Sequence, residues 1–164
     1  MIKLIVLDVD GCLTDGKLTY SADSIESKSF NVKDGLGIAS WNRLGNHTAI
    51  ITGKKSAMVH KRAEELGIKH LYQGITDKQS VIKDIVKSFG LEFYEVAVIG
   101  DDLNDYNMLR LVDESFTPLN GVKEIKEIVK TTLSFNGGDG AVREMIDILV
   151  DKNSQRDAFM DLWI

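Results

Sequence analysis

Two aspartates, Asp8 and Asp10, directly follow the apolar run Ile2–Leu7, and Gly11 comes next. The run has the composition of a buried strand, and a glycine allows the chain to turn away after it. At the end of a strand the chain can curl so that both carboxylates face one crevice, which is where open α/β sheets bind ligands. A carboxylate pair there can provide one attacking group and one proton carrier, or it can hold a divalent cation through oxygens.

Three further polar signals occur later in the chain. Thr52–Lys54 follows the apolar run His47–Ile51, and Lys78 begins a helical pattern. The acidic run Gly100–Asp105 follows the apolar run Val96–Ile99. Because the carboxyl ends of parallel strands gather at one edge of a sheet, we expect all four signals to meet in one place.

Phosphoryl transfer is the chemistry that needs this combination. A phosphoryl group and an attacking carboxylate are both negative, so positive charge is required, and magnesium held by carboxylates would supply it. Lys78 would add a second cation, and the Thr52 hydroxyl with nearby backbone N–H groups would donate to phosphate oxygens. A nucleophilic aspartate would form an acyl phosphate, while Asp10 would protonate the leaving alkoxide and later deprotonate water.

This ordered set resembles the haloacid dehalogenase superfamily, whose pattern is D-x-D-G, then Thr or Ser, then Lys, then G-D-D or a similar acidic motif. The resemblance implies Asp8 as the nucleophile and Asp10 as the acid/base. Magnesium would be held by Asp8, the Asp10 main-chain carbonyl and Asp101. Asp102 and Asp105 would support this metal shell. The residues expected to contact the phosphoryl group or the rest of the substrate are Thr52, Gly53, Lys54, Lys78 and Asn104.

Longer stretches, over about residues 2–150, resemble one subfamily without a cap domain, the 3-deoxy-D-manno-octulosonate 8-phosphate phosphatases. The similar stretches are Asp8–Asp15, Phe30–Ile38, Ile51–Ser56, Leu71–Gly74, Gly100–Asp105 and Gly137–Glu144. Enzymes of this subfamily are magnesium-dependent homotetramers in which projecting hairpins form a central barrel and a neighbouring subunit completes each site. The resemblance implies the same assembly here. It also implies hydrolysis of the eight-carbon 8-phosphate through an aspartyl-phosphate intermediate.

Two positions keep the identity of the sugar open. Many octulosonate phosphatases carry arginine where this chain has Lys54 and where it has Asp139. Lysine keeps the charge but lacks the bidentate fork, and aspartate reverses the charge. Related enzymes for nine-carbon sugar acid 9-phosphates often have an acid at the second position, so a substrate of the sialic acid type is the alternative. The cations expected to hold the substrate carboxylate are Lys33, Lys54, Lys55 and Arg62.

The elements that must position these residues can be predicted from the alternation of strand-like and helical runs. It indicates an α/β fold, with a doubly wound, Rossmann-like parallel sheet and helices on both faces. The expected strands are Ile2–Leu7, His47–Ile51, His70–Tyr72, Val96–Ile99 and, less clearly, Ser115–Thr117. Apolar residues at helical spacing predict core-facing helices over the ranges Lys78–Phe89, Val122–Val129 and Ala141–Leu149. The interval before His47 has room for one further helix, Asp34–Leu44.

Two regions interrupt the alternation. Lys17–Phe30, with the polar turn Ser21–Ser24, predicts a β-hairpin that projects after the first strand. The intervals between motifs are too short for a cap domain, so either the substrate is large or another subunit covers an open site. Residues 1–150 are expected to form one core domain and residues 151–164 a tail. The apolar end of the tail, Arg156–Ile164, would close the chain's own core or dock on another subunit.

The composition narrows the possible partners and location. Of the 164 residues, 43% are hydrophobic and 27% are charged, which is ordinary for a soluble globular protein. The net charge of −5 and the lack of a basic stripe argue against nucleic acid and anionic membranes as partners. The chain begins with a predicted strand, and no apolar run approaches about 18 residues. A single cysteine, Cys12, excludes an internal disulfide, and we expect a cytoplasmic protein.

A receiver-type signalling domain is a hypothesis of a different class. Receivers also combine an acidic pair, a Thr or Ser, a Lys and a phosphorylated aspartate in a magnesium site. Their acceptor, however, closes a middle strand, whereas His47–Ile51 is followed by Thr52 and no acid. An inactive scaffold of the same fold would have lost some of its acids, yet Asp8, Asp10 and Asp101 are all present. Both alternatives are therefore disfavoured relative to a phosphatase.

Overall fold

A six-stranded parallel sheet forms the centre of the structure, a computed structural model that describes residues 1–164. The strand order is β5-β4-β1-β6-β7-β8, and every neighbouring pair is parallel. The strands are β1 (Leu4–Leu7), β4 (His47–Thr52), β5 (His70–Gln73), β6 (Val96–Ile99), β7 (Glu114–Thr117) and β8 (Thr131–Thr132). The predicted fold class is confirmed, and β8 is a strand that the sequence pattern did not indicate.

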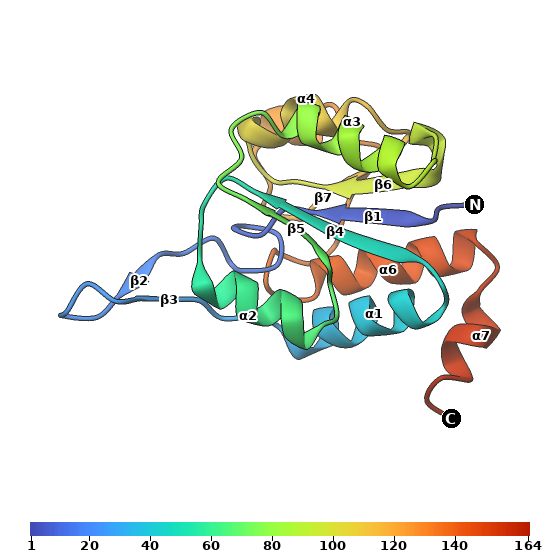
Figure 1. The fold of residues 1–164 in the computed structure, drawn as a ribbon, viewed down its shortest axis with the longest axis horizontal. Coiled ribbons are helices and arrows are strands. Elements are labelled where there is room, and N and C mark those ends of the chain that lie inside the picture. Colours follow the sequence, from blue (N-terminus) through green and yellow to red (C-terminus); the bar gives the residue numbers. More distant parts are fainter.

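Helices cover both faces of the sheet (Figure 1). One layer contains α1 (Val32–Arg43), α2 (Ala57–Glu65), α6 (Ala141–Lys152) and α7 (Arg156–Met160). The other contains α3 (Lys78–Ser88), α4 (Tyr106–Leu109) and α5 (Lys123–Lys126). Two short 3-10 helices, Phe93–Glu95 and Leu103–Asp105, complete the regular structure. No helix combines the length and the apolar character that crossing a bilayer requires.

The central strands are apolar along their whole length because both of their faces are buried. Successive side chains of β1 point to opposite faces, so Ile5 and Leu7 join the core under α1 and α6, whereas Leu4 and Val6 join the core under α3. These two cores fix the register of β1. They therefore fix the position at which the chain leaves the sheet and the acidic pair begins.

The predicted helix near Val122–Val129 is shorter than its apolar pattern indicates. Only α5, four residues long, is helical. The chain must turn after it to enter β8, where Thr131 pairs with Phe116 of β7. Pairing of β8 with β7 therefore ends the helix earlier than the apolar periodicity of this segment predicts.

The predicted hairpin is present and projects from the sheet (Figure 1). Its strands are β2 (Thr19–Tyr20) and β3 (Glu26–Ser27), which pair in antiparallel register. Several apolar side chains of the hairpin, Leu18, Tyr20 and Ile25 among them, are exposed. As expected, no cap domain is inserted between the hairpin and α1.

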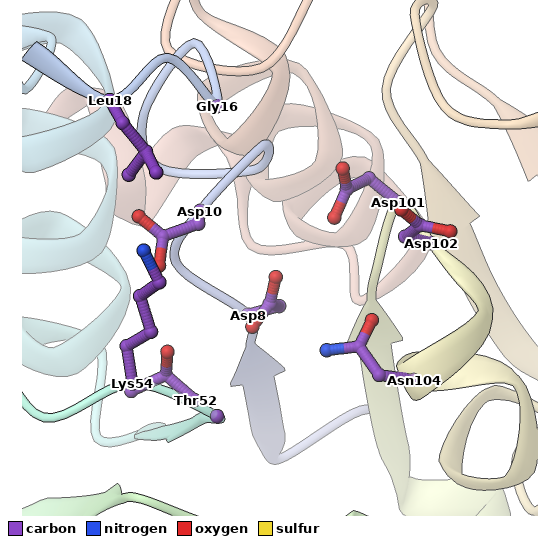
Figure 2. Close-up of a pocket in the computed structure, with 10 residues that line it drawn as sticks. Asp8, Asp10, Gly16, Leu18, Thr52, Lys54, Asp101, Asp102 and Asn104 are labelled. Atoms are coloured by element: carbon purple, nitrogen blue, oxygen red, sulfur yellow. The ribbon is translucent and has the colours of Figure 1, made fainter.

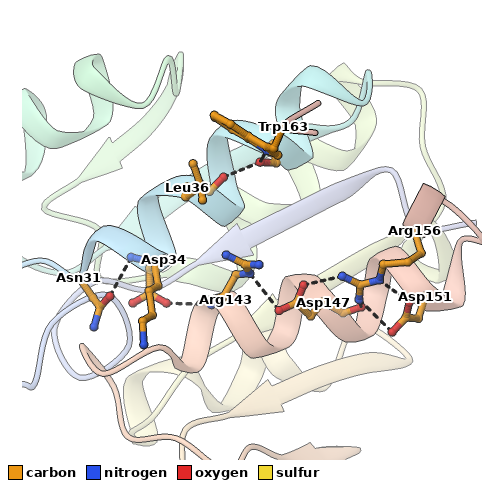
Figure 3. A network of polar contacts seen from close by, with 10 residues as sticks. Asn31, Asp34, Leu36, Arg143, Asp147, Asp151, Arg156 and Trp163 are labelled. Carbon is orange, nitrogen blue, oxygen red and sulfur yellow. Dashed lines mark hydrogen bonds and ion pairs between the residues drawn. The ribbon is translucent and has the colours of Figure 1, made fainter. Parts of the chain in front are cut away.

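The C-terminal tail packs against its own chain. Phe159 of α7 is buried in the core formed with α1 and α6. Arg156 donates to Asp147 and Asp151 of α6 (Figure 3). The Trp163 indole N–H donates to Ser40 Oγ at 3.0 Å. Phe159 therefore contributes to the chain's own core, whereas Met160, Trp163 and Ile164 are exposed. Docking of the tail end on another subunit stays a prediction.

Candidate active site

The carboxyl ends of β1 and β6 place Asp8 and Asp101 on neighbouring strands. β1 pairs with β4 on one side and with β6 on the other, and the chain order reverses at this point. Such a switch point opens a crevice at the carboxyl edge of the sheet. A cavity of about 310 Å³ lies there (Figure 2). Of the residues predicted for catalysis, metal binding and phosphate binding, all except Lys78 and Asp105 line this cavity.

Lys78 does not line the cavity and is almost fully buried. It is the first residue of α3, and its Nζ lies 2.7 Å from Asp8 Oδ1 and 2.6 Å from Asp105 Oδ1. Burial opposes the charge of Lys78, but the two carboxylates outweigh that effect and raise its pKa. The ammonium is thus engaged by two carboxylates, so its first structural task is to hold the Asp8 side chain.

Asp105 anchors the acidic loop after β6. Its side chain is fully buried, and Oδ2 accepts the backbone N–H of Asp101 at 3.0 Å while Oδ1 binds Lys78. Asp102 caps the 3-10 helix by accepting the Leu103 N–H at 2.7 Å. Asp105 therefore positions Asp101 through its backbone, without lining the cavity itself.

The donor set at the cavity floor is suited to a hard cation. Ligand atoms of Asp8, Asp101 and Cys12 lie within 4.8 Å of one another. Burial raises the pKa of the Asp8 carboxyl well above its usual range, and that of Asp101 to about 7, with repulsion from neighbouring carboxylates adding to both. Burial likewise raises the pKa of the Cys12 thiol, so sulfur stays protonated and the carboxylate oxygens are the available ligands. The site as built is short of positive charge.

Gly11 permits this close arrangement. Its φ is +95°, and a Cβ at this position would lie 2.0 Å from Asp101 Oδ2. Gly137 and Gly138 pack closely against the loop that follows Asp8. A Cβ on Gly137 would meet the backbone of Gly11, and one on Gly138 would meet the backbone of Thr14 and Asp15. The N–H of Gly138 donates to the Cys12 carbonyl at 3.0 Å. These contacts give a physical reason for the glycine-rich motif near residue 137.

The remaining predicted residues lie around the cavity mouth. Thr52 is the last residue of β4, and its side chain is buried against the cavity, followed by Gly53 and Lys54. In Figure 2, Lys54 extends toward Asp10 and the Asn104 amide points toward the centre of the site. The Thr52 hydroxyl, the Gly53 backbone and the Asn104 amide therefore line the cavity together with the carboxylates.

Of the four cations expected to hold a substrate carboxylate, only Lys54 lines this cavity. Arg62 lies over the Phe30 ring, with its guanidinium carbon 5.8 Å from the ring centre. Lys33 and Asp139 line a separate cavity beside α6. Asp139 therefore does not line the cavity formed around Asp8 and Asp10 of its own chain.

The sequence reasoning missed two hairpin residues at the site. Leu18 lines the cavity, and Lys28 Nζ lies 2.5 Å from Asp10 Oδ1. A single lysine in a polar, mostly exposed hairpin gives no indication in the sequence that it reaches the site. Its contact depends on how the hairpin folds back toward the end of β1, which sequence spacing does not reveal.

Comparison with known proteins gives a consistent result. Residues 70–146 match the family model of haloacid dehalogenase-like hydrolases. The 3-deoxy-D-manno-octulosonate 8-phosphate phosphatase KdsC of Haemophilus influenzae is 35% identical over 158 residues, which cover 96% of this chain and 88% of that protein. KdsC of Escherichia coli K12 is 37% identical over 149 residues, which cover 91% of this chain and 79% of that protein.

Two solved structures match the fold of this chain over nearly its whole length. The octulosonate 8-phosphate phosphatase of Moraxella catarrhalis, in complex with magnesium ion, phosphate ion and a KDO molecule, matches with a TM-score of 0.95 at 39% identity. That match covers 99% of this chain and 94% of the other. The cobalt-bound phosphatase of H. influenzae matches with a TM-score of 0.92 at 35% identity, over 97% of this chain and 93% of the other.

Proposed function

Because this chain belongs to the 3-deoxy-D-manno-octulosonate 8-phosphate phosphatases among the haloacid dehalogenase-like hydrolases, we propose that it hydrolyses the 8-phosphate of this eight-carbon sugar acid to the free sugar acid and phosphate. One observation carries the proposal. Asp8, held by Lys78, and Asp101 meet at the carboxyl edge of a fold that superimposes on an enzyme solved with magnesium, phosphate and the sugar acid.

Magnesium is the cofactor in this proposal, and the donor set fits it. Asp8, the Asp10 main-chain carbonyl and Asp101 would hold the ion, with Asp102 in support. The raised pKa values of Asp8 and Asp101 indicate that these carboxylates need a balancing cation. When bound, magnesium offsets the negative charge of the phosphoryl group and of the attacking carboxylate.

The chain's own residues account for the chemical steps. Lys78 holds Oδ1 of Asp8, which leaves Oδ2 to attack phosphorus. The new bond from Asp8 to phosphorus forms as the ester bond to the sugar oxygen breaks, and Asp10 gives that oxygen a proton. Water then attacks phosphorus, passes its proton to Asp10 and releases phosphate, which restores both aspartates. Thr52 and Asn104 would donate to the phosphoryl oxygens during both steps.

A nine-carbon sugar acid 9-phosphate is the second candidate substrate. Asp139 is the feature that favours it, yet this residue lies outside the substrate cavity of its own chain. A role for Asp139 in substrate choice would therefore have to act across a subunit boundary. The eight-carbon substrate is favoured because the relatives matched over most of the chain carry that activity in their names.

We also propose a homotetramer in which the hairpin is the contact element. Exposed apolar side chains, Tyr20 and Ile25, lie on a two-stranded hairpin that projects from the body of the protein. The cavity is open, so a neighbouring subunit would cover the bound sugar. Sedimentation equilibrium should give four chains per particle. A monomer at all concentrations would contradict both the assembly and the shared site.

The cytoplasm is the location that suits this enzyme, and the sugar phosphate is its partner rather than nucleic acid or membrane. The net charge of −5 disfavours polyanionic partners, and the single cysteine makes no demand for an oxidising compartment. Fractionation of the source cells should recover the protein with soluble cytoplasmic markers. Recovery with membranes would contradict this assignment.

The experiment that tests the proposed function is a comparison of phosphate release from a panel of substrates. The purified full chain, with magnesium, would be given the eight-carbon 8-phosphate, nine-carbon 9-phosphates and hexose 6-phosphates. The highest kcat/KM is expected for the eight-carbon acid. Preference for a nine-carbon acid would reassign the substrate, and equal rates on hexose phosphates would contradict a sugar-acid phosphatase. Stoichiometric phosphorylation without turnover would instead favour a receiver.

A further inference from the structure

Lys28 is a buried cation that reaches the candidate acid/base from outside the sheet. Its side chain is only 2% exposed, and Nζ lies 2.5 Å from Asp10 Oδ1. The same ammonium lies 3.1 Å from Glu26 Oε1. A lysine is seldom this buried unless its charge is compensated, and here two carboxylates compensate it.

The contact is the one hydrogen bond made by the Asp10 side chain. Asp8 is fixed by Lys78, and Asp105 by both Lys78 and the Asp101 N–H, but Asp10 has no partner other than Lys28. Removal of the Lys28 ammonium would therefore leave the Asp10 carboxylate free to rotate. Glu26, two residues earlier in the extended chain, lies on the same face of the hairpin and helps to hold the lysine in place.

We propose that Lys28 is a positioning residue for proton transfer, an inference that rests on the proposed function. By engaging Oδ1, it leaves Oδ2 of Asp10 as the oxygen that carries the proton between the sugar oxygen and the attacking water. Lys28 does not touch the phosphoryl group in this role. It fixes the direction from which Asp10 delivers and removes the proton.

The role can be tested with two leaving groups. A sugar alkoxide leaves poorly unless it is protonated, whereas p-nitrophenolate leaves readily without a proton. In Lys28→Met, the first turnover of octulosonate 8-phosphate should slow by about 100-fold, the lower range for loss of a general acid. The first-turnover burst of p-nitrophenolate should stay within about threefold of wild type. Its steady-state rate should fall, because the second step still requires Asp10 to deprotonate water.

Three controls separate positioning from structural damage. Lys17→Met removes an exposed lysine of the same hairpin and should leave all rates unchanged. Lys28→Arg keeps a cation and should restore part of the loss on the sugar phosphate. Sedimentation of each variant checks that the assembly is intact.

Equal loss of both bursts would overturn the proposal, because it would mean that the site as a whole is damaged. Unchanged sugar-phosphate turnover in Lys28→Met would overturn it as well. If wild type prefers another alkyl phosphate, the proposed substrate fails, but the same comparison with that ester still tests Lys28.

Discussion

The Lys78 ammonium lies 2.7 Å from Asp8 Oδ1, and both side chains are almost fully buried. The same ammonium also binds Asp105. One cation therefore links the carboxyl end of β1, the start of α3 and the loop after β6. Phosphate binding was the role expected for this lysine from the sequence. The geometry adds a structural role, since two buried carboxylates depend on it.

Substitution of Lys78 should therefore reduce stability as well as activity. Lys78→Met leaves two buried carboxylates without a balancing cation, and removing one member of a buried ion pair typically costs about 3–5 kcal/mol. Urea unfolding without magnesium would measure this change. Lys123→Met, which removes an exposed lysine 3.7 Å from Glu127, should change the free energy of unfolding by less than about 1 kcal/mol. Similar values for the two variants would contradict the structural role.

Magnesium should stabilise the folded protein through Asp101. A ligand that binds only the folded state adds about 2.7 kcal/mol of stability when its concentration is 100 times its Kd. Thermal unfolding of the wild type should therefore shift upward with added magnesium. In Asp101→Asn this shift should be lost or strongly reduced, whereas Asp113→Asn, at an exposed position outside the site, should respond as the wild type does. An equal shift in Asp101→Asn would exclude Asp101 as a ligand.

Asp34 should make stability depend on pH. Burial raises the pKa of this carboxyl to about 6, although the backbone N–H groups of Arg143 and Gly140 oppose the rise. Its Oδ1 accepts the Arg143 N–H at 2.8 Å, and Oδ2 is buried without a partner (Figure 3). An acid with a raised folded-state pKa contributes stability that is fully present below its unfolded pKa of about 4 and is lost as pH rises through about 6.

Asp34→Asn removes this titration while keeping an acceptor for the Arg143 N–H. Between pH 4 and pH 7, the wild type should lose about 2 kcal/mol of unfolding free energy relative to the variant. Urea unfolding at several pH values in this range would measure the difference. Parallel pH curves for the two proteins would show that Asp34 keeps an ordinary pKa.

Gly137 should be intolerant of any side chain. A Cβ at this position would lie 1.7 Å from the Gly11 carbonyl oxygen, so alanine would push the glycine-rich loop away from the loop that carries Asp8 and Asp10. Gly137→Ala should therefore lose most phosphatase activity and lower the unfolding midpoint. Gly45→Ala is the matched control, because its φ is +85° but nothing lies within 4 Å of the added Cβ. That variant should lose about 1–2 kcal/mol and keep its activity.

Much of this arrangement follows from local rules. Asp8 could be placed at the sheet edge because β1 is a continuous apolar run, and parallel strands end on the same side. β8 could not be predicted, since two residues give no periodicity and Thr131 becomes a strand only by pairing with Phe116. The contact between Lys28 and Asp10 was missed for a similar reason. It depends on the path of a hairpin in space rather than on spacing along the chain.

The proposed mechanism depends above all on covalent phosphorylation of Asp8. The most direct test is to quench the enzyme with acid during turnover of octulosonate 8-phosphate, reduce any acyl phosphate with borohydride and sequence the peptides by mass spectrometry. Homoserine is expected at position 8. It should depend on substrate and magnesium and be absent from Asp8→Asn, which should not turn over. Modification at another carboxylate, or substantial turnover by Asp8→Asn, would contradict this mechanism.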